Sequence, residues 1–479
     1  MSGAGGDEQA SAQGRTDRGP AVAEPVPVIV TAGTRPGPTP TDHGPVGAVP
    51  AKKPPYPPPA SVFTQAGPEG IRFDFNAGAR VALPPRITGK WRVRLRDLDT
   101  GNTLFDSENK GAIVTSNKRW YVRFGVDVWA IEEGEPGQPT QPPREVLRHE
   151  HDLAGRDVLV LFPVGTLGDI LAWFPYAARF AAQHPGARIT CALSGLIIPL
   201  LRDAHPELTL VTHEEMQEQK LPETAYATYC LGLFFDDAAC EWQPTDFRHV
   251  GLHRTAGYIL GVDPAEEPAR LGVSDEGRPV AERYAVIAVQ ASSGCKMWHN
   301  PDGWRAVVKH LKARGLRVVC IDQKAPHGQG LLWSHVPHGC EDETGDRPLA
   351  ERVRWLRHAE VFVGLSSGLA WLAWSAGCPV VMVSGFTHPT NEFATPYRVH
   401  NWHTCNSCWN DPALRFDHDD FLWCPRHAGT PRQFECTRLI GPEAVLRAID
   451  RVPGVVAPSP SSPPDPVPVT ARLPEELPA

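Results

Sequence analysis

The sequence lacks three features that would indicate common functional classes. It has no surplus of positive charge, since 47 Lys and Arg face 55 Asp and Glu and leave a net charge of −8. A global electrostatic grip on nucleic acid or on an anionic membrane is therefore not expected. The opening MSGAGGDEQASAQGRTDRG has no apolar core of the kind that signal peptides carry. No Gly-x-Gly-x-x-Gly fingerprint marks the first strand-to-helix turn, which argues against a dinucleotide dehydrogenase.

Cysteine is present, with 11 residues, and without a secretory signal we expect a reducing cytosol and no disulfides. One uncharged stretch, 361–387, is long enough to span a bilayer. Its two short β-branched runs, VFVG and VVMV, flank a helix pattern that stops at Gly377. This stretch therefore predicts strand, helix and strand, and no membrane insertion is expected.

The 479 residues divide by composition into several parts. Residues 1–58 and 453–479 are Pro-rich and are predicted to be disordered. Residues 59–135 alternate apolar and polar side chains and predict a small all-β domain, followed by a Pro-rich linker. Strands then alternate with helices over 150–270 and again over 280–452. The α/β pattern predicts two Rossmann-like domains around a cleft, the GT-B glycosyltransferase arrangement, although a two-lobed binding protein would share it.

The first candidate residue for chemistry is Asp169, which follows the predicted strand VLVLFP and opens a helix. Two interpretations are open. Asp169 caps the helix, where free backbone amides favour a carboxylate. Alternatively, it points into the cleft and takes a proton from an acceptor hydroxyl.

Two further loops at strand ends carry groups suited to phosphate. A lysine can neutralise a diphosphate leaving group, and a helix that opens directly after a strand presents free amides to an anion. A solvated lysine and a plain helix cap are the simpler alternatives. The candidates are Ser292, Ser293 and Lys296 in the first loop, and Ser366, Ser367 and Gly368 in the second.

The most specific motif is a cysteine cluster near the C-terminus. Four thiolates on a loop-rich segment predict a closed tetrahedral metal site, with zinc as the default and iron as the alternative. Because no coordination position stays open, the metal is expected to be structural, and no catalytic metal is predicted. We interpret His403, His418 and His427 as surface residues. The four cysteines are Cys405, Cys408, Cys424 and Cys436, within a finger at 405–436.

Together these motifs resemble the bacterial autotransporter heptosyltransferases, relatives of the family 9 heptosyltransferases of lipopolysaccharide synthesis. The likeness covers about residues 60–450 and rests on RVRLRDLDTGNTLF, RWYVRFGVDVW, GTLGDILAWFPY, ASSGCKMWHNPDGW, GLSSGLAWLAWSAGCPVVMVSGFTHPTNEF and the four-cysteine finger. Ordinary lipopolysaccharide enzymes lack the β segments and the finger. They usually carry Asp-Thr-Gly-Leu and a His where this chain has Ser366 to Leu369 and Trp371.

The resemblance implies an inverting enzyme that transfers heptose from ADP-heptose to serines of an autotransporter passenger protein in the cytoplasm. It assigns the general base to Asp169, the ADP diphosphate to Lys296, and the donor phosphate loop to Ser366 through Leu369. It also implies one structural iron per chain in place of zinc. A large homo-oligomer, such as a dodecamer, is a further implied property.

Three alternatives stay open at this point. A lipopolysaccharide heptosyltransferase would share the donor site but act on a carbohydrate-lipid acceptor. A two-lobed nucleotide-binding scaffold without catalysis would keep Lys296 but tolerate the loss of Asp169. A zinc-finger protein that binds nucleic acid would need a basic face, whereas the finger sequence NDPALRFDHDDF is acidic.

Overall fold

The computed structural model describes residues 29–31, 60–134, 141–163 and 166–456. The two terminal segments for which we predict disorder lie almost entirely outside these residues.

The β-rich segment is joined to the first α/β region through one continuous sheet. Strand β3 pairs in parallel with β13, so that Phe75 lies opposite Ala227. A nine-stranded sheet results, with the order β1-β7-β4-β3-β13-β10-β11-β12 and β2 beside β3. Its N-terminal strands are β1 (Ile29–Thr31), β2 (Gln65–Ala66), β3 (Arg72–Asn76), β4 (Arg80–Leu83) and β7 (Ala112–Thr115).

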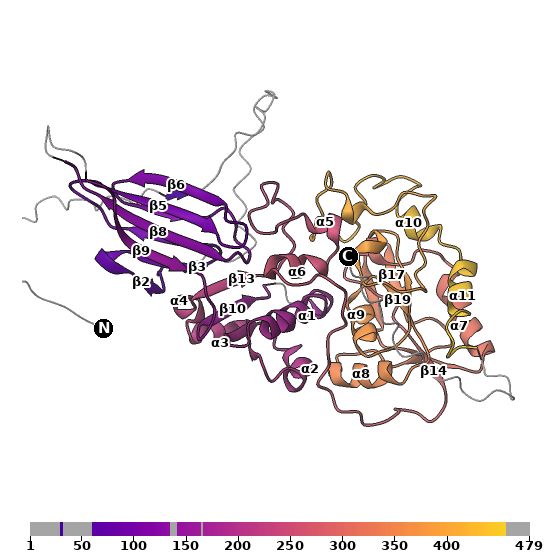
Figure 1. Ribbon diagram of the computed structural model, residues 1–479. Coiled ribbons are helices and arrows are strands. Elements are labelled where there is room, and N and C mark those ends of the chain that lie inside the picture. The colour runs from indigo at the N-terminus through magenta and orange to yellow at the C-terminus, as the bar shows by residue number, and fades with distance from the viewer. Residues whose placement is uncertain (1–28, 32–59, 135–140, 164–165, 457–479) are drawn as a thin grey trace, which may run out of the picture.

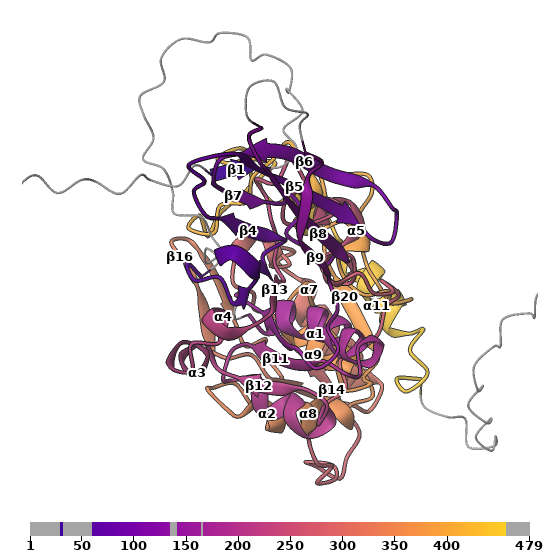
Figure 2. The same ribbon diagram turned by 60° about the vertical axis from the view of Figure 1, so that its left-hand side comes forward.

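A second, antiparallel sheet with the order β6-β5-β8-β9 packs beside it and lies at the top of the view in Figure 2. Along β5, Trp91, Val93 and Leu95 are buried, because side chains alternate between the two faces of a strand. Strand β9 lies in the segment that the sequence predicts as a linker, and the Pro-rich residues before it hide its pattern. The strands are β5 (Lys90–Asp97), β6 (Thr103–Asn109), β8 (Phe124–Ile131) and β9 (Arg144–Glu150).

The first α/β region, which we call the first lobe, has four parallel strands in the order β13-β10-β11-β12. Helix α1 (Leu167–Gln183) follows β10 at the point where the strand order reverses, which is where ligands bind in such sheets. The strands are β10 (Asp157–Leu161), β11 (Arg188–Ala192), β12 (Thr209–Val211) and β13 (Ala227–Cys230). The remaining helices are α2 (Ile198–Leu201), α3 (His213–Glu218), α4 (Leu221–Thr224), α5 (Phe247–Val250) and α6 (Arg254–Leu260).

The second lobe contains a five-stranded parallel sheet with the order β18-β15-β14-β19-β20. The predicted strand, helix and strand over the uncharged stretch are confirmed as β19, α9 and β20. In the part of the chain that the structure describes, no helix is long and apolar enough to cross a membrane. The strands are β14 (Tyr284–Ile287), β15 (Arg317–Cys320), β18 (Glu341–Asp342), β19 (Phe362–Leu365) and β20 (Val380–Val383). The helices are α7 (Gly303–Ala313), α8 (Leu349–Arg357), α9 (Gly368–Ser375) and α11 (Pro442–Ile449).

The two lobes meet where α1 and α9 lie side by side (Figure 1). Two glycines allow this approach. A Cβ placed on Gly168 would lie 3.2 Å from the Trp371 ring, and one on Gly368 would lie 3.0 Å from the Cβ of Leu167. Both helices begin at the carboxyl ends of their strands, so the contact brings two strand-to-helix loops to one place.

The finger contains little regular structure, with a short turn at Cys408–Asn410 and the helix α10 (Glu435–Arg438). Its aromatic residues form a core of their own that also buries Phe247 of the first lobe and Phe386 of the second. A hairpin that the sequence analysis did not predict, β16 (Pro326–Gln329) and β17 (Leu332–His335), stands beside it. The predicted architecture of two Rossmann-like lobes, β strands and a finger is confirmed.

Candidate active site

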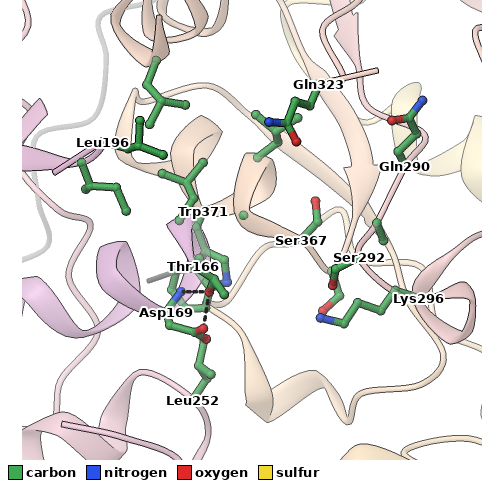
Figure 3. Close-up of a pocket in the computed structure, with 18 of the residues that line it drawn as sticks. Thr166, Asp169, Leu196, Leu252, Gln290, Ser292, Lys296, Gln323, Ser367 and Trp371 are labelled. Carbon is green, nitrogen blue, oxygen red and sulfur yellow. Dashed lines mark hydrogen bonds between the residues drawn. The ribbon is translucent and has the colours of Figure 1, made fainter. Parts of the chain in front are cut away.

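A cleft of about 1390 Å³ lies between the two lobes, and the finger forms part of its wall. Figure 3 shows Thr166 and Asp169 on one side and Ser292 and Lys296 on the other, with Ser367 between them. The cleft thus collects all three loops that the sequence analysis singled out. The predicted residues that line it are Asp169, Ser292, Lys296, Ser366, Ser367, Gly368 and Leu369.

Asp169 occupies the first turn of α1 but is not its N-cap. Thr166 is the N-cap, and its hydroxyl accepts a hydrogen bond from the backbone N–H of Asp169. The same hydroxyl donates to the Asp169 carboxylate. The capping role that the sequence left open therefore falls to Thr166, and the carboxylate of Asp169 faces the cleft.

The surroundings of Asp169 suit a group that exchanges a proton. Burial raises the pKa of Asp169 above its usual value, whereas the Thr166 hydroxyl and the nearby Lys296 and His418 oppose that rise. The side chain is half-buried and lines the cleft. A carboxylate with a raised pKa in a cleft is typical of a general base.

The loop after β14 places Lys296 in the cleft. Its ammonium lies 5.6 Å from the ring centre of Phe386 and 5.9 Å from that of Trp409, so aromatic faces hold the cation. Ser292 is exposed to the cleft. Ser293 is buried, donates to the carbonyl of Phe421 over 3.2 Å, and is not among the residues of the cleft wall. The structure therefore gives no support to the donor-binding role predicted for Ser293.

The loop after β19 contains two serines with different surroundings. Ser366 is buried and donates to Glu392, which Arg398 holds through a 2.8 Å contact, so this hydroxyl is already engaged. Ser367 is the N-cap residue of α9, and its Oγ is buried without a hydrogen-bond partner. The free amides of α9 and this hydroxyl together offer donors to an anion.

Sequence reasoning missed the contribution of the finger to the cleft. Trp409, Arg415, Phe416 and His418 all line it, although we expected His418 to be an ordinary surface residue. Asp322 at the end of β15 lines it too, and burial raises the pKa of that carboxyl to about 6. The cysteine spacing predicted a metal site only. It gave no information on the orientation of the finger loop, so the contribution of that loop to the cleft wall could not be predicted.

The four finger cysteines are free thiols that interact electrostatically with one another. Burial and the neighbouring Cys405 raise the pKa of Cys408 to about 12. The thiols of Cys405, Cys408 and Cys424 also act electrostatically on Cys436. Four thiols in a loop-rich segment fit a structural zinc or iron ion, which displaces their protons when it binds.

A second set of ligand atoms shares Cys405 with the four cysteines. The side-chain donor atoms of Cys405, His427 and Glu435 are within 4.8 Å of one another. However, Glu435 already accepts a hydrogen bond from the backbone N–H of Cys405 over 3.0 Å and pairs with Arg432 over 2.7 Å. We therefore keep the four cysteines as the proposed ligands.

Comparison with known proteins decides the family. Residues 67–132 match the model of the glycosyltransferase TibC N-terminal domain, and residues 258–418 match glycosyltransferase family 9 (heptosyltransferase). The autotransporter heptosyltransferase BAHTCr of Citrobacter rodentium is 50% identical over 396 residues, which cover 82% of this chain and 92% of that protein. The chain belongs to the autotransporter heptosyltransferase family.

Two further members frame what the family can do. The crystal structure of a dodecameric, iron-containing heptosyltransferase, TibC of Escherichia coli, in complex with ADP-D-β-D-heptose superposes with a TM-score of 0.75 at 48% identity. The match covers 82% of this chain and 98% of that one. The autotransporter heptosyltransferase BimC of Burkholderia thailandensis, described as inactive, is 44% identical over 84% of this chain and 90% of its own. BAHTCr and TibC are named as heptosyltransferases, and BimC is the relative described as inactive.

Proposed function

We propose that this chain is an active protein O-heptosyltransferase that transfers heptose from ADP-heptose to serine hydroxyls of an autotransporter passenger protein. The observation that carries the proposal is the pairing of Asp169 and Lys296 in one cleft, where the positive charge of Lys296 acts on the Asp169 carboxyl. One group can take the proton of an acceptor, and the other can hold an anionic leaving group.

The proposed reaction is a single displacement at the anomeric carbon. The serine oxygen forms a bond to that carbon, and the bond from the carbon to the ADP diphosphate breaks with both electrons leaving on ADP. The serine proton goes to Asp169. Lys296, the Ser367 hydroxyl and the first amides of α9 receive the charge that develops on the diphosphate. Attack opposite the leaving group inverts the configuration.

The charges of the cleft support a protein acceptor rather than an anionic lipid. Among the described residues of the first-lobe wall there is no Lys or Arg, whereas Asp169, Asp236 and Asp237 contribute carboxylates. Of these, Asp236 pairs with Arg415 of the finger over 2.9 Å. Cations line the second-lobe side instead, at Lys296, Lys324, Arg347 and Arg352. A phosphorylated lipid would face the carboxylates of Asp169 and Asp237 on the first-lobe wall, whereas a neutral peptide hydroxyl would meet no such repulsion.

A scaffold without catalysis remains the second candidate, because the family includes the inactive BimC. Such a protein would bind a nucleotide through Lys296 and need no base. The raised pKa of Asp169 and its hydrogen bond to Thr166 favour the enzyme, because a cap alone would not need a carboxylate facing the cleft.

The metal, the assembly and the location of the enzyme complete the proposal. Cys405, Cys408, Cys424 and Cys436 would hold one structural ion per chain, and iron is preferred to zinc because the TibC structure is iron-containing. We propose a homo-oligomer, with the dodecamer of TibC as the expected form. The protein would act in the cytoplasm, before its acceptor is exported.

The test is a transfer assay with purified protein, ADP-heptose and a passenger protein. We expect released ADP and an intact-mass increase on the passenger in steps of one heptose, with a lipid acceptor left unmodified. The Asp169→Asn protein serves as the inactive control. Nucleotide binding by the wild type without any mass increase would support the scaffold instead.

A further inference from the structure

His418 reaches the cleft from the finger and packs against the finger and the first lobe. It lines the same cleft as Asp169 and Lys296. Its ring lies edge-on to Phe416 of the finger, with 4.8 Å between ring centres, and edge-on to Phe235 of the first lobe at 6.4 Å. Phe416 is itself buried in the aromatic core of the finger. The imidazole therefore has a defined position, although it belongs to a loop.

His418 lines the cleft near both the proposed base and the proposed diphosphate ligand. Lys296 and Asp169 both act electrostatically on His418, and His418 acts on Asp169 in return. Partial burial and Lys296 lower the pKa of His418, while Asp169, Asp417 and Asp419 oppose that change, so the surroundings favour the neutral ring. Within the part of the chain that the structure describes, no hydrogen bond occupies a ring nitrogen of His418.

The roles proposed for Asp169 and Lys296 indicate which group of the substrate would lie beside His418. If Asp169 takes the acceptor proton and Lys296 holds the diphosphate, the group between them is the transferred sugar. A neutral imidazole offers one hydrogen-bond donor and one acceptor, which suits a hydroxyl group. We propose that His418 hydrogen-bonds hydroxyl groups of the transferred sugar and contributes to the selection of that sugar. This inference rests on the proposed donor.

The test compares the binding of ADP and of ADP-heptose by calorimetry in the full-length, metal-loaded protein. For His418→Ala we expect ADP affinity to stay within about twofold, while ADP-heptose affinity falls roughly tenfold, as for one lost hydrogen bond. His418→Gln should recover part of the loss, because an amide also donates and accepts. His403→Gln is the matched control, since His403 is an exposed histidine that precedes the finger and lies outside the cleft wall.

The outcomes separate this inference from the proposed function. Equal losses for ADP and ADP-heptose, or loss of metal from His418→Ala and His418→Gln alike, would assign His418 to the nucleotide or to folding and overturn the inference. A wild-type protein that gains no affinity from the sugar would overturn both the donor and the role of His418. A wild-type preference for ADP-heptose that His418→Ala preserves would overturn the role of His418 alone.

Discussion

Asp169 is the single side chain whose removal should cost the most activity. Asp169→Asn keeps the size and polarity of the group but removes its ability to accept a proton, so transfer should fall by about 100- to 10,000-fold. ADP affinity should change little, because Lys296 and the α9 loop remain. Glu214→Gln, in the first turn of α3 and exposed, is the control. Wild-type turnover in Asp169→Asn would reduce the residue to a structural one.

The pH dependence of transfer should follow the Asp169 carboxyl. Its pKa is raised by burial, so activity should disappear on acidification at a higher pH than for an exposed aspartate. Lys296 stabilises the carboxylate, so removing its charge raises the pKa of Asp169 further. We therefore expect the acidic limb of kcat in Lys296→Met, measured at saturating donor, to move to higher pH. An unmoved limb would mean that another group controls the profile.

At this scale the sequence predicted part of the site. Asp169, Lys296 and Gly368 could be identified from the sequence because each follows an apolar run that is typical of a strand. Loops at strand ends meet at one edge of a parallel sheet. The orientation of Ser293 could not be predicted, since neighbouring residues in a loop can point to opposite sides. His418 reaches the cleft only through tertiary packing on Phe235 and Phe416, which no local pattern encodes.

Among the structural elements, the contact between α1 and α9 leaves little room for a larger side chain. In Gly368→Ala the new methyl would lie 3.0 Å from the Cβ of Leu167 and 3.1 Å from the backbone nitrogen of Gly168. The helices must then separate, which should lower the free energy of unfolding by about 1–3 kcal/mol and weaken ADP binding. Chemical denaturation and calorimetry measure the two effects.

The control for this variant is Gly186→Ala, where the nearest atom to the added methyl is an ordinary 3.5 Å away. This protein should unfold like the wild type. Unchanged stability and ADP affinity in Gly368→Ala would show that the two lobes can shift apart freely.

The finger is the element that should depend on the metal. The finger has few regular elements, so we expect metal binding by its four thiols to supply part of its folding free energy. Cys424→Ser should lose the metal, and it should also lose affinity for ADP. The reason is that the backbone N–H of Gly294 donates to the carbonyl of Phe421 over 2.8 Å, so the finger holds the loop that carries Lys296.

Elemental analysis measures the metal content, thiol titration counts the free cysteines, and calorimetry measures the affinity for ADP. Cys191→Ser, in the buried strand β11, should keep the metal. Wild-type protein purified without chelators that contains neither iron nor zinc, with four thiols freely titratable in the native state, would contradict the assignment.

At the scale of the whole molecule, the β-rich N-terminal part should not be removable. The pairing of Phe75 with Ala227 joins it to the first lobe, and the His149 ring lies 2.8 Å from the hydroxyl of Tyr226. A chain that starts at residue 152 would leave β13 as an unpaired sheet edge, which promotes aggregation. We expect it to elute as soluble aggregate in size-exclusion chromatography, whereas a monodisperse product would contradict the continuous sheet.

The overall arrangement shows where sequence patterns stop being informative. Short apolar runs predicted most strands of the two lobes but not β13, and the β3–β13 pairing joins residues far apart in sequence and leaves no local trace. The sequence therefore predicted a boundary between a β domain and the first lobe, whereas the structure has one nine-stranded sheet that spans both.

The position of the finger on both lobes also sets an order in time. Asn410 donates to the carbonyl of Arg248, 162 residues earlier in the chain, and Phe247 beside it is buried by finger residues. At a synthesis rate of about 5–20 residues per second, the first lobe waits about 8–30 s after leaving the ribosome before its covering residues are made. During that interval Phe247 is open to chaperones and to other nascent chains. If the four cysteines hold a metal as proposed, the finger side of the cleft is complete only after Cys436 has emerged, and donor binding by a newly made chain must wait for it.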